Sequence, residues 1–559
     1  MWDFTTATEI SDINTPAHLL TCLIISVLNA LLILLISNKF LQIMQQSGYE
    51  GFGYFKWLRR RDNVYLSRLI TVSLLSLLGF LLFNIIFAFA EGAWIFYVGF
   101  IFYVAFSLNY FRADQKRKKK IPIVYTARMV RLIVAYFLLV TALTFLFLIS
   151  LNVIAFYFRD NLLFVRIRFA GLCLMPALVP ILVLLAYYIM KPYEIYVQNT
   201  YIKKCKQKLE ERKDLIKIGI TGSYGKTSVK KFLCTILEEK YRVLATPSSY
   251  NTPMGICKTV KHLKNDHEVF IAEMGARHVG DIKKLTEIVK PNYAVINGII
   301  GQHLETFGSI NAIKQTKYEL VENMNGGVVA YTVDSENTIA LFSNCQIKSI
   351  PAGLNLMANP EVYAKDITVN ENGSDFILVI GKKEIRCHTV LVGMHNVSNI
   401  CLASAIAYEL GLTLSEISAG ISRLTMVDHR LSITKTERGI TIIDDSYNSN
   451  EKGFECALQV LNYFPGRKIV VTPGMVELGV TEDMQNYEIG IKLSKSCDIA
   501  VLVGRTGAFI IKRGLIESGF NPENIIQAST LEQAMKKLKD VLKEGDVILY
   551  ENDLPDKFS

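Results

Sequence analysis

The sequence lacks paired cysteines, and it is poor in charge. None of the ten cysteines lies in a CxxC pair, so neither a zinc ribbon nor a small disulfide framework is indicated. We expect the cysteines to be reduced and mostly buried, as in a protein whose polar part faces the cytosol. Only 20% of the residues are charged and 51% are hydrophobic, which excludes a disordered or fibrous chain.

Acidic residues are scarce in the N-terminal third. Residues 1–200 contain 18 Lys and Arg against 9 Asp and Glu, whereas the rest of the 559 residues contain 43 against 42. Basic residues between apolar segments usually set membrane orientation. This distribution therefore disfavours a basic nucleic-acid-binding domain, and no nucleic-acid partner is expected.

Five stretches of that third are long and apolar enough to cross a hydrocarbon core of roughly 30 Å. They cover residues 17–37, 69–90, 93–111, 132–156 and 169–190. We therefore predict a membrane domain over residues 1–200 with the lipid bilayer as its partner. None of the five stretches carries a charge near its middle, which disfavours an ion pathway.

Basic loops predict the orientation of these spans. Lys39, Lys56 and Arg59–Arg61 lie between the first two spans, and a run from Lys116 to Lys120 follows the third. Such loops face the cytoplasm, so the N-terminus should lie outside and everything after Lys191 inside. The loop between the last two spans disagrees, because it would lie outside and yet carries Arg159, Arg166 and Arg168.

After residue 200 the pattern changes to short apolar runs that alternate with helical periods. This alternation is typical of an α/β domain with a mostly parallel sheet. The first run, residues 215–220, is followed by TGSYGKTS and an amphipathic helix. A strand, a glycine loop and a helix in that order form the context of a phosphate-binding loop.

Each residue type in this loop suits phosphate binding. Gly222 and Gly225 let backbone N–H groups surround phosphate oxygens, Lys226 reaches the β- and γ-phosphates, and Thr227 can ligate magnesium. We therefore predict a nucleotide and Mg²⁺ as ligands, with nucleotide contacts from Thr221, Gly222, Ser223, Tyr224, Gly225, Lys226, Thr227 and Ser228. The usual GxxxxGK spacing would need glycine at Ile220, so the loop is a variant, and a glycine turn without a ligand is the alternative.

Further motifs follow in order along the chain. They are SSYNTPMG (248–255), IAEMGARHVGDI (271–282), GQHLETFGSI (301–310), KQTKYEL (314–320), GMHNVSN (393–399), DHR (428–430), IIDDSYNSN (442–450) and GMVELG (474–479). With the loop, they resemble the Mur ligase family, the ATP-dependent amide-bond-forming enzymes of peptidoglycan synthesis, and within it the MurF branch. The resemblance covers about residues 215–555. It implies a P-loop-type parallel-sheet ATPase domain over residues 201–430 and a Rossmann-like α/β domain over residues 431–559.

The resemblance implies that ATP phosphorylates a substrate carboxylate, which an amine then attacks. Glu273 follows an apolar run, so it should lie at the carboxyl end of a strand where ligands gather, and it matches the metal-binding glutamate of the family. His303 matches the second metal ligand of the family, and Lys317 matches a lysine that carbon dioxide carbamylates into a further metal-supporting anion. These residues, with Lys226, form the predicted catalytic set.

The resemblance also assigns residues in the second half. Asn399 resembles the adenine-reading asparagine, Arg430 an arginine that reaches the ATP phosphates from the far domain, and Asp445 a residue that meets the nucleotide there. They imply a cleft that closes between the two domains. The incoming amine should be faced by Tyr447, Asn448 and Glu477.

Three departures from the family pattern leave the substrates open. Apolar spans replace the domain that grips the UDP-sugar, while Glu451 and Pro473 change two motifs on the amine side. We expect a membrane-tethered ligase that acts on a UDP- or lipid-linked envelope precursor and an amino acid or dipeptide, at the cytoplasmic face of a bacterial membrane. The alternatives are a ligase similar to folylpolyglutamate synthase and an inactive membrane scaffold. The sequence leaves the oligomeric state open.

Overall fold

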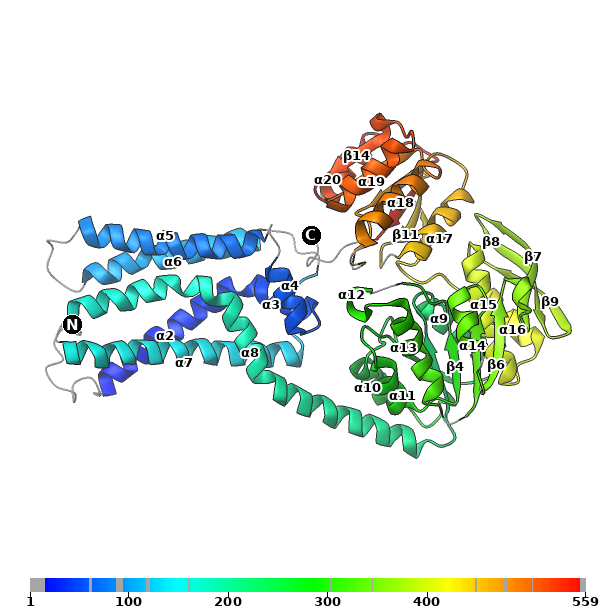
Figure 1. Cartoon of the computed structure of the whole chain (residues 1–559), viewed down its shortest axis with the longest axis horizontal. Helices are drawn as coiled ribbons and strands as arrows, with labels where there is room; N and C mark the ends of the chain where they lie inside the picture. Colours follow the sequence, from blue (N-terminus) through cyan, green and yellow to red (C-terminus); the bar gives the residue numbers. More distant parts are fainter. Residues whose placement is uncertain are drawn as a thin grey trace. The chain divides into compact units, whose positions relative to one another are not determined.

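The computed structural model describes residues 16–59, 63–86, 94–116, 121–158, 161–301, 304–324, 326–343, 345–447, 450–476, 478, 481–504 and 506–552. The chain divides into two compact units, Met1–Val197 with Leu554–Ser559, and Gln198–Asp553. Figure 1 shows the chain with many of its helices and strands labelled.

The first unit is built from helices. They are α2 (Pro16–Ile36), α3 (Asn38–Gln46), α4 (Gly51–Leu58), α5 (Val64–Ile86), α6 (Trp94–Gln115), α7 (Ala127–Phe158) and α8 (Asn161–Glu211), which continues into the second unit. Among the described residues, four segments are long and apolar enough to cross a membrane, namely Leu19–Ile36, Val64–Ile86, Ala127–Leu151 and Arg166–Glu211. They confirm apolar helices at four of the five predicted spans. Helix α6 covers the remaining one, but the side chains of residues 94–99 lie outside the described part. Membrane crossing itself stays a prediction for all five.

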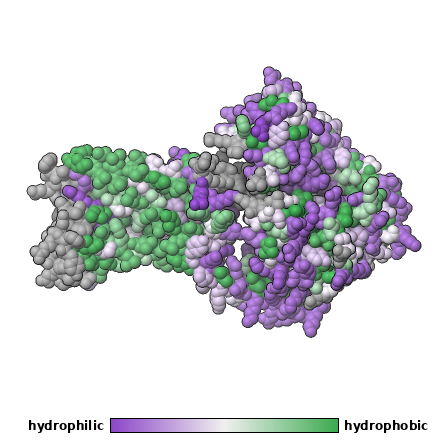
Figure 2. Space-filling view, viewed as in Figure 1, coloured by the Kyte–Doolittle hydropathy of each residue, from purple (hydrophilic) through white to green (hydrophobic). Residues whose placement is uncertain are grey.

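Large apolar side chains lie both inside and outside this helical unit. Phe40, Tyr103 and Tyr136 are fully buried, whereas Leu28 and Ile181 are 60% and 63% exposed. A helix that is apolar on all sides suits a membrane or the core of a large protein. Figure 2 shows a largely apolar surface over the first unit and a mixed, mostly polar surface over the second.

The second unit contains two sheets with helices on their faces. In the first sheet the strands are β1 (Ile216–Thr221), β2 (Val243–Ala245), β3 (Val269–Glu273), β4 (Tyr293–Ile296), β5 (Val328–Thr332), β6 (Lys348–Gly353), β7 (Val362–Asn370), β8 (Gly373–Ile380) and β9 (Lys383–Thr389). Their order is β2-β3-β1-β4-β5-β6-β7-β8-β9. The pairs from β2 to β7 are parallel, and β7, β8 and β9 form an antiparallel meander.

Two hydrophobic clusters cover the faces of this sheet, as expected for a parallel sheet whose central strands are buried on both sides. One cluster joins the sheet to α9 (Lys226–Leu237), α15 (Met394–Glu409) and α16 (Leu414–Ser422). The other joins it to α10 (Pro253–Lys261), α11 (Asp281–Val289) and α13 (Ile310–Glu322). The short helices α12 (Leu304–Phe307), α14 (Glu336–Phe342) and η1 (Leu356–Ala358) lie in the connections.

The second sheet has six strands in the order β10-β11-β15-β12-β13-β14. They are β10 (Ser432–Lys435), β11 (Thr441–Asp445), β12 (Lys468–Thr472), β13 (Ile499–Val503), β14 (Ile525–Ala528) and β15 (Val547–Glu551). All neighbours are parallel except β10 and β11. The accompanying helices are α17 (Glu451–Asn462), α18 (Glu482–Ser494), α19 (Thr506–Glu517), η3 (Pro522–Asn524) and α20 (Leu531–Lys539).

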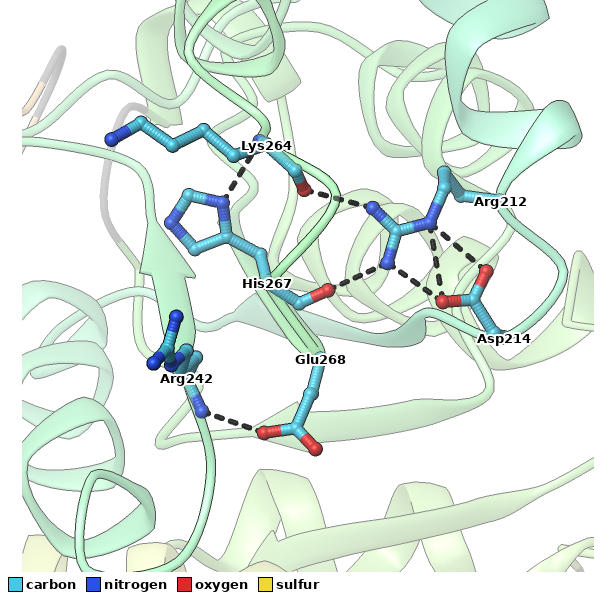
Figure 3. A network of polar contacts seen from close by, with 6 residues as sticks. All are labelled: Arg212, Asp214, Arg242, Lys264, His267 and Glu268. Carbon is cyan, nitrogen blue, oxygen red and sulfur yellow. Dashed lines mark hydrogen bonds and ion pairs between the residues drawn. The ribbon is translucent and has the colours of Figure 1, made fainter.

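The last turns of α8 belong to the second unit and are fixed to it by polar contacts. Cys205 and Leu209 are buried in the cluster with α10 and α11. Just after the helix, the Arg212 guanidinium donates to the carbonyls of Lys264 at 2.8 Å and His267 at 2.7 Å, and it pairs with Asp214 (Figure 3). The charged stretch of residues 201–211 is therefore the C-terminal end of α8.

Candidate active site

The glycine loop connects β1 to α9 and is held tightly against the end of β4. Gly222 has φ +151° and Gly225 has φ +70°, values that L side chains rarely adopt. A Cβ on Gly225 would lie 2.2 Å from the Asn297 amide nitrogen, and one on Gly222 would lie 3.0 Å from the Asn297 Cβ. Both glycines are therefore required by conformation and by space.

The other loop residues fix this conformation. The Ser223 N–H donates to the Gly298 carbonyl at 2.8 Å, and the Thr221 hydroxyl donates to the Met274 carbonyl at 3.0 Å. The Tyr224 ring packs against Gly298, where an added Cβ would lie 2.0 Å from the tyrosine oxygen. Ser228 lies half-buried in the first turn of α9.

Lys226, the first residue of α9, curls back over the loop. Its ammonium donates to the carbonyls of Gly222 at 2.7 Å and Ser223 at 3.1 Å. Burial lowers the pKa of Lys226 to about 8, the Glu273 carboxylate opposes this shift, and Arg430 adds to it. The two hydrogen bonds therefore hold the Lys226 ammonium against the glycine loop, beside the N-terminus of α9.

Glu273 ends β3, and the parallel register sets it opposite Ile220 of β1, directly beside the loop. Its carboxylate accepts hydrogen bonds from the Thr227 hydroxyl at 3.0 Å and from the Lys230 ammonium at 2.9 Å. The Asn251 amide donates to the other carboxylate oxygen at 3.1 Å. The prediction that Glu273 lies at the carboxyl end of a strand beside the loop is confirmed.

The charge of Glu273 is stabilised despite its burial. The residue is 1% exposed. Burial raises the pKa of its carboxyl, but the charges of Lys230 and Lys226 and the hydrogen bonds from Lys230 and Asn251 outweigh burial and hold the pKa below its ordinary value. The carboxylate is thus ionised, buried and next to a hydroxyl.

Lys317 lies on α13 and is 4% exposed. Burial and, to a smaller extent, the nearby charge of Lys226 lower its pKa to about 7, although Asp281 and Glu319 act in the opposite direction. Near neutral pH, Lys317 therefore carries a large fraction of uncharged amine, which is the nucleophilic form.

Asn399 reaches the glycine loop from α15. Its side-chain oxygen accepts a hydrogen bond of 2.8 Å from the Asn297 amide, and it lies 3.0 Å from the position of a Cβ on Gly225. Asn297 is 2% exposed and Asn399 6%. The structure thus brings the predicted base-reading asparagine to the loop, through a partner that the sequence did not indicate.

Arg430, Asp445 and Tyr447 cluster around the start of the second sheet. The Arg430 guanidinium stacks 4.6 Å from the centre of the Tyr447 ring, and the Tyr447 hydroxyl hydrogen-bonds the Ser249 hydroxyl. Burial raises the pKa of Asp445 to about 7, while Arg430 and a hydrogen bond with Glu551 oppose the shift. Glu551 is the register partner of Asp445 on β15.

Three predicted residues, His303, Asn448 and Glu477, lie outside the described residues. The sequence did not predict three further residues that contact the site. They are Lys230 and Asn251, which hydrogen-bond Glu273, and Asn297, which hydrogen-bonds Asn399. A signal for Lys230 existed, because it follows Thr227 by three positions and therefore shares its face of α9. Asn251 and Asn297 reach the site only through strand pairing, which the sequence does not specify.

Two family models match the second unit. Residues 220–407 match the Mur ligase middle domain, and residues 429–550 match the Mur ligase glutamate ligase domain. The chain belongs to the Mur ligase family. The predicted membership is therefore confirmed, and residues before 220 lie outside both matched domains.

Two relatives of this Mur ligase chain share one name. The UDP-N-acetylmuramoyl-tripeptide--D-alanyl-D-alanine ligase of Buchnera aphidicola subsp. Baizongia pistaciae is 33% identical over 300 residues, which cover 53% of this chain and 65% of the relative. The ligase of the same name from Bacillus subtilis is 28% identical over 336 residues, 60% of this chain and 72% of the relative. The chain thus spans about two thirds of the length of these relatives.

Solved structures show the same fold. MurF from Acinetobacter baumannii superposes with a TM-score of 0.59 at 25% identity, covering 64% of this chain and 77% of that protein. MurF from Thermotoga maritima in complex with ADP superposes with a TM-score of 0.57 at 24% identity, covering 64% and 80%. The Mur ligase α/β fold of the second unit, with its parallel sheets, is therefore established.

Proposed function

We propose that the chain is a membrane-tethered ATP-dependent ligase of the MurF type that forms an amide bond on a cell-envelope precursor. The observation that carries this proposal is the group formed at the glycine loop by half-buried Lys226 and the buried Thr227 and Glu273. The names of the relatives, UDP-N-acetylmuramoyl-tripeptide--D-alanyl-D-alanine ligase, support the substrate class.

The residues at the loop fit a nucleotide and a divalent cation. The N-terminus of α9 and the glycine turn present backbone N–H groups, which favour phosphate oxygens. The Thr227 hydroxyl and the Glu273 carboxylate lie 3.0 Å apart, and oxygen donors of this kind suit Mg²⁺. Thr227 and Glu273, with Lys317 and His303 as further candidates, would hold the cation, which would supply charge neutralisation at the phosphates.

The reaction joins a carboxylate to an amine. The substrate carboxylate oxygen attacks the γ-phosphorus of ATP, ADP leaves, and the resulting acyl phosphate is attacked by an amine, which loses a proton as phosphate departs. Such chemistry depends on positioning and on charge stabilisation. Lys226 would stabilise charge on the phosphates, and Arg430 with Asp445 would approach the nucleotide from the second sheet.

Lys317 has the properties that carbamylation requires. Only the neutral amine attacks carbon dioxide, and the N–C bond forms with loss of a proton to give a carbamate anion. With a pKa of about 7, Lys317 supplies that amine near neutral pH. The modified side chain would add an oxygen donor beside Lys226, whose charge lowers the Lys317 pKa and would stabilise an anion.

The first unit would hold the ligase at the bacterial cytoplasmic membrane with the N-terminus outside. Support comes from the apolar helices with outward-facing Leu and Ile side chains and from the basic loops. Protease added to inverted membrane vesicles should leave a tag at the N-terminus intact and cut the second unit. Cleavage of the tag would refute the proposed orientation.

The activity is tested by phosphate release from detergent-solubilised full-length protein with ATP and Mg²⁺. Acceptors are UDP-linked and lipid-linked muropeptides, and amines are D-Ala-D-Ala and single amino acids. Lys226→Ala is the blank, and Lys284→Ala is its matched control, because Lys284 is 68% exposed on α11 and pairs there with Asp281. Substrate-dependent release that survives Lys284→Ala and is lost in Lys226→Ala supports the ligase, whereas no release with any acceptor would favour the scaffold.

A further inference from the structure

A pocket in the first unit lies where α7 and α8 meet the turn between α3 and α4. It is small and partly open to the surface, and its lining includes Tyr49, Arg128, Leu132, Tyr187, Lys191 and Glu194. The lining combines apolar and aromatic side chains with the cations Arg128 and Lys191 and the carboxylate of Glu194. Nothing in the ligase chemistry of the second unit uses this pocket.

The pocket and its immediate surroundings carry more positive than negative charge. Glu194, whose side chain is 9% exposed, is held by Arg131 through hydrogen bonds of 2.6 and 2.9 Å to its two oxygens. Arg128 lies farther away, 3.8 Å from the same carboxylate. The two arginines share this one carboxylate, and with exposed Lys191 the three cations exceed it by two positive charges.

Arg128 is held in place before any ligand binds. Its guanidinium carbon lies 4.0 Å from the centre of the Tyr49 ring. The Gln45 amide donates to the Tyr49 hydroxyl at 3.3 Å and to the Val124 carbonyl at 2.7 Å. The side chain of Gln45 thereby ties the turn that carries Tyr49 to the segment that leads into α7. A prearranged cation loses less entropy on binding an anion.

The surroundings match the headgroup level of a membrane. Val130 and Val134 on α7 and Leu185 and Ile189 on α8 are 41–56% exposed, which provides an apolar surface for acyl or prenyl chains. Exposed Tyr188 and Tyr193 accompany the basic residues, as in an interfacial belt. Glu194 lies three residues before the end of the first unit at Val197, so the pocket is on the side where the chain enters the second unit.

We propose that this pocket binds the diphosphate of a diphosphate-linked lipid, which, if the proposed ligase function holds, is the carrier of the acceptor substrate. A diphosphate carries several negative charges and matches two cations from different helices better than a singly charged phospholipid does. Arginine can bind phosphate oxygens in two places at once, and lysine adds a point charge. The lipid chain would follow the exposed faces of α7 and α8.

Binding is tested with a fluorescent polyprenyl diphosphate and the full-length protein in detergent, by anisotropy without ATP. Arg128→Gln and Lys191→Gln should each weaken binding by roughly tenfold, the loss of one charged hydrogen bond. Arg59→Gln is the matched control, because its guanidinium also stacks on an aromatic ring, Phe55, at 4.7 Å, but does not line the pocket. Equal affinity in all four proteins would overturn the proposal.

Competitors distinguish the sources of the phosphate. Unlabelled polyprenyl diphosphate should displace the probe, whereas inorganic diphosphate and phosphatidylglycerol should not at similar concentrations. Displacement by inorganic diphosphate would assign the pocket to a soluble anion, and displacement by phosphatidylglycerol would assign it to bulk anionic lipid. Either result overturns the proposal.

Turnover separates this inference from the ligase proposal. Arg128→Gln with Lys191→Gln should raise KM for a lipid-linked acceptor and leave the ATP KM unchanged. Ligase activity on a UDP-linked acceptor by a protein that does not bind the probe would refute the pocket assignment alone. Probe binding that is lost in the variants, without phosphate release from any acceptor, would support the pocket and refute the ligase.

Discussion

The Lys230 ammonium lies 2.9 Å from the Glu273 carboxylate, and the two side chains are 5% and 1% exposed. This pair joins α9 to the end of β3 beneath the glycine loop. Lys230→Met would leave the carboxylate buried without its nearest positive charge, and breaking a buried pair in this way costs about 3–5 kcal/mol. We expect the thermal unfolding midpoint of the second unit to fall by roughly 10 °C.

The unfolding midpoint of the double variant Lys230→Met with Glu273→Gln is compared with that of Lys230→Met alone. The double variant removes both charges, so we expect it to recover part of the lost stability. Lys284→Met, which breaks an exposed pair with Asp281, should change the midpoint little. A midpoint for Lys230→Met equal to that of Lys284→Met would contradict the stabilising role of the buried pair.

Alanine substitutions at Gly225 and Gly280 separate two effects, the steric clash of a Cβ with Asn297 and the strain of a positive φ. Both glycines precede a helix with positive φ, +70° and +87° respectively. A Cβ on Gly225 would lie 2.2 Å from the Asn297 amide, whereas a Cβ on Gly280 would have no heavy atom within 4 Å. Gly225→Ala should therefore abolish ATP binding, and Gly280→Ala should cost only the strain, about 1 kcal/mol.

Equilibrium binding of a fluorescent ATP analogue to the solubilised protein checks this difference. The Gly280→Ala protein should bind with the affinity of the unmodified chain. Equal loss of binding in both variants would mean that strain, rather than the contact with Asn297, requires glycine at position 225.

Much of the fold could be predicted because local patterns specify it. The strand at 215–220 is found one residue later as β1, and the predicted loop and helix follow it. Apolar helices occupy four predicted spans. The predicted span at 169–190 is only part of helix α8, which continues through the charged residues up to Glu211.

The site could be predicted only where a residue lies next to a recognisable motif. Lys226, Thr227 and Glu273 are of this kind. Asn251 lies 22 residues before its hydrogen-bond partner Glu273. Asn297 lies 102 residues before its partner Asn399. Such contacts depend on which strands become neighbours, and strand order is a property of the whole sheet. The short helices α3 and α4 were likewise missed, because their packing against α7 and α8 defines them.

Tyr447 positions Arg430 through its ring. The guanidinium stacks on the ring at 4.6 Å, and the hydroxyl contacts Ser249. Tyr447→Phe keeps the stacking and should leave the ATP KM nearly unchanged. Tyr447→Leu removes it, a loss of about 0.5–1 kcal/mol, so the ATP KM should rise two- to fivefold. Steady-state phosphate release measures both, and an equal rise for Phe and Leu would assign the effect to the hydroxyl.

Lys317 should make the enzyme depend on pH and carbon dioxide together. Its pKa of about 7, lowered from 10.5 mainly by burial, means that the neutral amine grows as pH rises through 7. We expect phosphate release in bicarbonate buffer to increase between pH 6 and 8 and to fall when carbon dioxide is removed. With ¹³C-bicarbonate, a carbamate NMR signal should appear in the unmodified protein and in Lys314→Met, a change one turn earlier on α13, but not in Lys317→Met.

The lowered pKa of Lys317 also makes the stability of the folded chain depend on pH. Between pH 7 and 10.5 the unfolded chain keeps a proton on Lys317 that the folded chain has released, so stability should rise with pH across this window. Below pH 7 the amine is protonated in both states, and its burial is a constant penalty. Lys317→Met removes the titrating group, so its unfolding midpoint should be higher than that of the unmodified protein at pH 6, and the difference should shrink towards pH 10. A difference that stays constant with pH would contradict the lowered pKa.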